Sequence, residues 1–125
     1  PNYISPEMQR YHWFDIVTSS SKMHRLMQMD FDKCCNKWVT EQSKRQMKEL
    51  ISDYNANQCE DNFMKVLSNC PQGVMLFMRV STNYEQLRTI YLQRRNHKLP
   101  EWRVFCKWIE SLPYAEELII CKQTE

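Results

Sequence analysis

Apolar positions recur with helical spacing along much of the chain. Between Trp38 and Tyr54 they return every three or four residues with charged side chains between them, which predicts an amphipathic helix. Similar spacing from Phe63 to Leu67 and from Leu87 to Arg94 predicts two more helices. The polar stretch from Asn55 to Asp61 predicts a loop between the first two. These segments indicate a chain dominated by helix.

Two other runs favour strand. Residues Tyr11 to Val17 are rich in aromatic and β-branched side chains and predict a strand or a short buried element. Residues Val74 to Val80 form a continuous apolar run after Gly73 and predict a buried strand. Residues Leu118 to Ile120 fit a terminal strand or a helix end. With no internal repeat and no linker-like composition, the expected fold is a helix-dominated α+β single domain over residues 1–125.

Helix boundaries are marked by capping residues and prolines. Thr82 to Glu85 fits a capping box in which the Thr82 hydroxyl is the N-cap. Pro100 fits the first position of a last helix, and Pro113 fits its end. Residues Thr18 to Ser21 offer N-caps for a helix through Met23, Leu26 and Met27.

Composition narrows the class and the compartment. The chain has one glycine, which favours helices joined by few tight turns. Its six cysteines are adjacent or widely scattered and include no C-x-x-C pair, so free thiols in a reducing compartment are expected. We find no signal peptide and no apolar run long enough to span a bilayer. A cytoplasmic protein without a membrane segment is therefore expected.

Positive charge is concentrated in the last third. Residues 79–107 contain seven basic and two acidic residues, a net +5, whereas the whole chain carries +2. Such a segment favours an anionic partner, but a solvated helix face would look the same.

No complete catalytic or metal-binding set is visible. The three histidines, His12, His24 and His97, have no histidine or aspartate three or four residues later, so no metal site is predicted. Ser21 and its neighbours could bind a phosphate or simply cap a helix. The basic cluster from Arg94 to Lys98 suits a helix C-terminus and would equally suit an anion.

Residues 81–118 resemble the C-terminal helices of flavin-dependent thymidylate synthase-like proteins, especially the small variants of bacteriophages and prophages. Asn83 matches the turn asparagine that contacts flavin in that family. Arg94 matches the helix-ending arginine that binds the phosphate of dUMP there. His97, Glu101 and Trp102 follow with a similar spacing.

The family signature R-H-R-x-x-S-x-N-E-x-S-x-R-Y is best placed on residues 11–24. His12 and Ser21 match it, whereas Tyr11 and Trp13 replace its first two arginines. A second flavin-binding arginine position falls on Glu85. Because a tyrosine cannot supply the fixed positive charge of a guanidinium, this pattern implies lost flavin catalysis.

The resemblance thus implies thymidylate synthase-like helices packed on a small sheet, in a homo-oligomer. FAD is the only cofactor that the family suggests, and none is expected to bind. The expected partner is a nucleotide, a nucleic acid or a host protein. A small phage inhibitor of a host antiphage factor, such as a nuclease or another defence protein, and an active flavin enzyme are the alternatives. The candidate ligand-binding residues are Arg94, Asn83, Ser21, His12, Arg95, His97 and Arg88.

Overall fold

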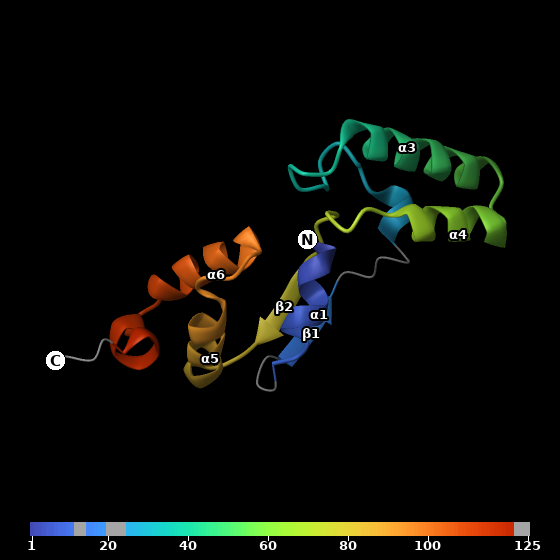
Figure 1. The fold of residues 1–125 in the computed structure, drawn as a ribbon. Coiled ribbons are helices and arrows are strands. Elements are labelled where there is room, and N and C mark those ends of the chain that lie inside the picture. The colour runs from blue at the N-terminus through green and yellow to red at the C-terminus, as the bar shows by residue number, and fades with distance from the viewer. Residues whose placement is uncertain (12–14, 20–24, 122–125) are drawn as a thin grey trace. The chain divides into compact units, whose positions relative to one another are not determined.

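The computed structural model describes residues 1–11, 15–19 and 25–121 (Figure 1). Helices dominate this part of the chain, as predicted, and two short strands, β1 (Asp15–Ser19) and β2 (Met78–Ser81), pair with each other. Contacts divide the chain into two compact units, each described by itself below. The first comprises Pro1–Ser5 and Thr18–Arg79, and the second comprises Pro6–Val17 and Val80–Glu125.

The first unit is built on α3 (Glu41–Ala56) and α4 (Glu60–Asn69), which lie side by side (Figure 1). The Thr40 hydroxyl accepts a hydrogen bond from the Ser43 amide at 3.1 Å and so caps α3. The predicted amphipathic helix is confirmed, although Trp38 lies before it and is 57% exposed. The unit also contains the 3₁₀ turns η1 (Asn2–Ile4) and η2 (Leu26–Gln28). Its buried core consists of Leu26, Phe31, Met47, Val66 and Val74.

The predicted buried strand over residues 74–80 is wrong for most of its length. β2 begins only at Met78, and the side chains of Met75 and Phe77 are 43% and 81% exposed. Val74, which follows Gly73 and precedes Met75, is fully buried. The run therefore alternates between core and surface, because successive side chains of extended backbone point in opposite directions.

The second unit contains α5 (Tyr84–Arg94), α6 (Pro100–Glu110) and a final π-helical turn, η3 (Glu116–Ile120), which pack together. It also holds most of the short helix α1 (Ser5–Met8). The start of α6 at Pro100 is confirmed, and residues 118–120 form the helix end rather than a strand. Its buried hydrophobic side chains, among the described residues, are Leu87, Ile90, Tyr91, Trp102, Cys106, Ile109, Ala115 and Ile119.

The predicted capping box is displaced by one residue. Asn83, not Thr82, is the N-cap of α5, and its Oδ1 accepts a hydrogen bond from the Gln86 amide at 2.9 Å. Asn83 and Gln86 have the same three-residue spacing as Thr82 and Glu85, so the sequence allows either register.

Three further observations complete the fold. All six cysteines are free thiols. No helix in the described ranges is long and apolar enough to cross a membrane. Most of the helix start predicted at residues 18–23 lies outside the described residues. His12 and Ser21 also lie outside them.

Candidate functional site

The Arg94 side chain, at the last residue of α5, is surrounded by partners from its own unit. Its Nε donates a hydrogen bond to the Tyr11 hydroxyl at 2.8 Å. Its Nη1 lies 3.4 Å from Oε2 of Glu7 and 2.8 Å from Nε2 of His97. The side chain is only 17% exposed, so the guanidinium points into the unit.

Two aromatic rings lie beside the Arg94 guanidinium. Its Cζ atom lies 4.9 Å from the ring centre of Trp102 and 5.7 Å from that of Tyr11, which are cation–π distances. The Trp102 indole N–H also donates to Oε2 of Glu7. We call Glu7, Tyr11, Arg94, His97 and Trp102 the Arg94 cluster.

His97 connects the cluster to the loop between α5 and α6. Its Nδ1 lies 3.1 Å from the Leu99 amide, and its Nε2 faces Arg94, which can only donate. A neutral imidazole accepts at one nitrogen only, so one of these two contacts is not a hydrogen bond. Arg94 and His97, both singled out by the sequence, thus contact each other rather than face an open site.

The charge of Arg94 is compensated within the cluster. The Glu7 carboxylate lies beside it and is itself only 26% exposed. A phosphate that bound Arg94 in this arrangement would have to displace this carboxylate and the Tyr11 hydroxyl. Because a partly buried carboxylate left without its cation is costly, such an exchange is unfavourable.

The other predicted site residues do not gather around Arg94. Asn83 caps the opposite end of α5, which at 11 residues separates them by roughly 16 Å. Arg88 is exposed in the middle of α5. The Arg95 guanidinium lies over the Tyr91 ring, 5.9 Å from its centre.

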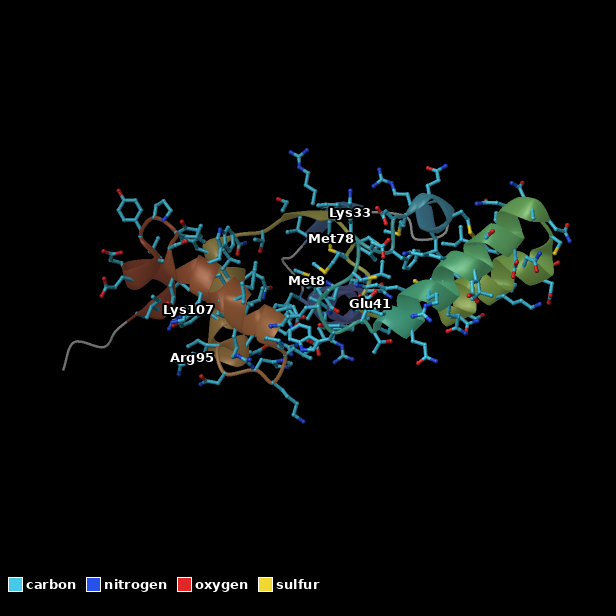
Figure 2. All side chains as sticks on the ribbon, turned by 90° about the horizontal axis from the view of Figure 1, so that it is seen from above. Met8, Lys33, Glu41, Met78, Arg95 and Lys107 are labelled. Carbon is cyan, nitrogen blue, oxygen red and sulfur yellow. The ribbon has the colours of Figure 1, made fainter. Side chains whose placement is uncertain are left out.

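Five cations on α5, α6 and the connection between them are exposed, however, and we call them the basic surface: Arg88, Arg95, Lys98, Arg103 and Lys107. Figure 2 labels Arg95, which directly follows α5, and Lys107 on α6. Lys107 lies 3.5 Å from a Glu110 carboxylate oxygen. Arg103 donates to the backbone carbonyls of His97 and Lys98 at 2.7 and 3.1 Å, and so closes the loop between the helices.

Most of this surface carries uncompensated charge. Within the described ranges, none of Arg88, Arg95, Lys98 and Arg103 forms an ion pair with a carboxylate. An anion that bound these exposed cations would not have to displace a partly buried carboxylate, as it would at Arg94. The basic surface is therefore the part of the second unit best suited to an anionic partner.

Tyr91 and Glu110 link α5 to α6 beside this surface. The Tyr91 hydroxyl donates to Oε1 of Glu110 at 2.9 Å. Burial raises the pKa of Tyr91, and the Glu110 carboxylate raises it further. The phenol therefore stays protonated and keeps donating at neutral pH.

The residues at the family's flavin positions do not fit a flavin phosphate. The Tyr11 hydroxyl is used by Arg94 and by Gln93, to whose Oε1 it donates at 3.0 Å. The Oδ1 atom of Asn83 is used as a helix cap, and Glu85 is an exposed acid. Among the described residues, no group of three histidine, cysteine or acidic side chains could hold a metal ion.

The sequence did not identify Glu7 as a partner of Arg94, and it did not predict that Arg94 donates a hydrogen bond to Tyr11. Glu7 lies in the four-residue helix α1, 87 residues before Arg94, where no periodic pattern marks it. The buried Trp102 indole N–H does signal a need for an acceptor, but it does not identify which one. No protein family, curated protein or solved structure matches this chain.

Proposed function

We propose that this chain is a phage-type thymidylate synthase-like domain that has lost flavin catalysis, and that its basic surface binds an anionic ligand in the host cytoplasm. The supporting observation is the exposure of five cations on α5, α6 and their connection, four of them without a carboxylate partner in the described residues. The ligand is of the nucleotide or nucleic-acid class, whose phosphates such cations bind.

This proposal moves the binding function from Arg94 to its exposed neighbours. Arg94 keeps a structural role, since Glu7, Tyr11 and Trp102 occupy its guanidinium. Arg95, the next residue, is exposed and forms no ion pair with a carboxylate of the described residues.

Fluorescence polarisation with a labelled single-stranded oligonucleotide tests the proposal. Binding should be measurable at low salt and should weaken steeply as salt rises, because phosphate contacts release counterions. The triple variant Arg88→Gln, Arg95→Gln, Lys98→Gln should reduce affinity by about tenfold or more. Arg45→Gln, an exposed cation of α3, is the matched control and should bind as the parent does.

Two results would contradict the proposal. The first is an absence of binding to oligonucleotide and to mononucleotide at low salt. The second is saturable binding of FAD, followed by flavin fluorescence, since it would support the active-enzyme alternative.

A second candidate function is inhibition of a host antiphage protein by direct contact. Val104 and Trp108 are exposed one turn apart on α6, and Trp108 stacks on Phe105 with ring centres 5.4 Å apart. Exposed aromatic side chains of this kind are typical anchors in protein interfaces. If Trp108→Ser abolishes capture of a host protein and leaves oligonucleotide binding unchanged, the protein partner is the better assignment.

The resemblance also implies self-association. Light scattering of the purified chain at several concentrations tests whether it forms a homo-oligomer.

A further inference from the structure

The first unit contains a cavity of about 520 Å³ that is separate from every residue discussed above as a site. It lies between η2, the loop that precedes α3, and the segment that follows Gly73. Its volume falls within the range of roughly 300–1,000 Å³ that is usual for small-molecule sites. Its lining residues within the described part of the chain all belong to the first unit.

One wall of the cavity is apolar and held in place by backbone hydrogen bonds. The Met75 amide donates to the Cys34 carbonyl at 2.7 Å, and Cys35 and Val74 form an antiparallel bridge. Because side chains alternate along this extended segment, Val74 enters the core while Met75 and Phe77 share the outer face. Met29 adds a further apolar side chain.

Phe77 adds an exposed aromatic side chain to this wall. Its ring is 81% exposed, although the ring is the largest apolar group in the cavity wall. Covering an aromatic ring and a neighbouring methionine releases apolar area from water, which favours a ligand with an apolar body.

The charged side chains of the cavity give it a net positive charge. Among the described lining residues, Arg25 and Lys33 are cations and Asp30 is the one acid (Lys33 is labelled in Figure 2). An oxygen of the Asp30 carboxylate already accepts the Asp32 amide at 3.0 Å. Neither Arg25 nor Lys33 forms an ion pair with any described residue.

The cysteine in the lining does not change this balance. Burial, with Cys35 beside it, raises the pKa of Cys34 to about 11. The thiol is therefore uncharged at neutral pH and contributes an apolar wall.

We propose that this cavity binds a small amphipathic organic anion, with its apolar body against Met29, Met75 and Phe77 and its carboxylate or phosphate group paired with Arg25 and Lys33. Apolar area supplies most of the affinity, and the two cations select a charged head group and fix its orientation. This binding activity is independent of the basic surface, which belongs to the other unit.

The probe for the test is anilinonaphthalene sulfonate, an aromatic anion whose fluorescence rises in apolar sites. It should bind at one saturable site per folded chain. Arg25→Gln, Lys33→Gln and Phe77→Ser should each weaken its binding by about five- to tenfold. The matched controls, Arg45→Gln and Trp38→Ser, change an exposed cation and an exposed aromatic outside the cavity and should leave the affinity unchanged.

Competitors with one aromatic body identify the head group. Displacement of the probe by 1-naphthoate indicates a carboxylate ligand, and displacement by 1-naphthyl phosphate indicates a phosphate ligand; either supports the proposal. The uncharged analogue 1-naphthylmethanol should compete at least about tenfold more weakly. Failure of both anions to compete, or equal competition by the uncharged analogue, overturns it.

Covalent labelling gives a second readout that does not depend on the variants. The bound probe should slow alkylation of Cys34, in the cavity wall, but not of Cys59, which precedes α4 and lies outside the lining. Equal rates at Cys34 with and without a saturating concentration of the probe would place the binding elsewhere and reject the assignment.

Discussion

Arg94 donates a hydrogen bond from Nε to the Tyr11 hydroxyl at 2.8 Å, across 83 residues of sequence. The resemblance noted for residues 81–118 predicts that Arg94 binds a nucleotide phosphate, and it places Tyr11 at an arginine position of the flavin signature. Here the two side chains bind each other. The Tyr11 phenol accepts the Arg94 hydrogen bond, and Glu7 supplies the countercharge.

Arg94→Ala should therefore lower the stability of the protein. The change removes the cation beside the partly buried Glu7 carboxylate and the group stacked on Trp102, for a loss of about 1–3 kcal/mol in the free energy of unfolding. Urea denaturation measures it. The neighbouring exposed Arg95→Ala should change stability by less than about 0.5 kcal/mol. Equal effects of the two substitutions would show that the Arg94 cluster is not a stabilising element.

The cap of α5 gives a sharp comparison between adjacent residues. Asn83→Ala should cost about 1 kcal/mol, since it leaves the Gln86 amide without its acceptor. Thr82→Ala should be close to neutral, because Thr82 precedes the cap and is exposed. Thermal unfolding of both variants decides the matter, and a larger loss for Thr82→Ala would restore the capping box predicted from the sequence.

These elements show where local sequence chemistry is sufficient and where it fails. Pro100 marks the start of α6 because the constraint lies in the residue itself. The caps at Thr82 and Asn83 satisfy the same rule, so the sequence cannot choose between them. The apolar run 74–80 fails for a related reason, since a hydrophobic residue in extended backbone can face either side.

The Arg94 cluster lies beyond any local rule. The sequence singled out Arg94 and His97 as ligand-binding candidates, and the structure brings these two into contact. Glu7 could not be identified, because an isolated acid 87 residues away shares no pattern with α5. Only tertiary packing places it beside the guanidinium.

The thiol of Cys34 should make stability depend on pH in the alkaline range. Burial raises its pKa to about 11 from an ordinary value of 9.0, so the folded state holds this proton more tightly than the unfolded state does. The resulting contribution to stability is complete below pH 9 and is lost as the pH rises towards 11. Alkylation rates at Cys34, followed by peptide mass spectrometry across this range, measure the shift.

The unfolded chain is the control for that titration. In urea the same thiol should react with the ordinary cysteine pKa of 9.0. In the Cys34→Ala variant, the free energy of unfolding should fall less between pH 9 and pH 11 than it does in the parent, because this thiol no longer titrates. Identical titration midpoints in the folded chain and in urea would contradict the prediction.

Gly73 is required by the space around it rather than by its backbone conformation. A Cβ atom there would lie 2.5 Å from Cγ2 of Val39 and 2.6 Å from Oδ1 of Asn36. Neither neighbour moves easily. Val39 is β-branched and has few rotamers. The Asn36 side chain is fixed by two hydrogen bonds of 3.2 Å: its Oδ1 accepts from the Trp38 amide, and its Nδ2 donates to the Tyr3 hydroxyl. Gly73→Ala should therefore destabilise the first unit by about 1–3 kcal/mol.

A compensating substitution tests that cause. Gly73 does not have a positive φ, so the loss should come from the contact and not from strain of the new alanine. Adding Val39→Ala to Gly73→Ala removes the shorter contact and should make the double variant more stable than the two single losses predict when added. Urea denaturation of the parent, both single variants and the double variant gives this coupling energy. Strict additivity, or a Gly73→Ala variant as stable as the parent, would mean that the turn has room for a side chain.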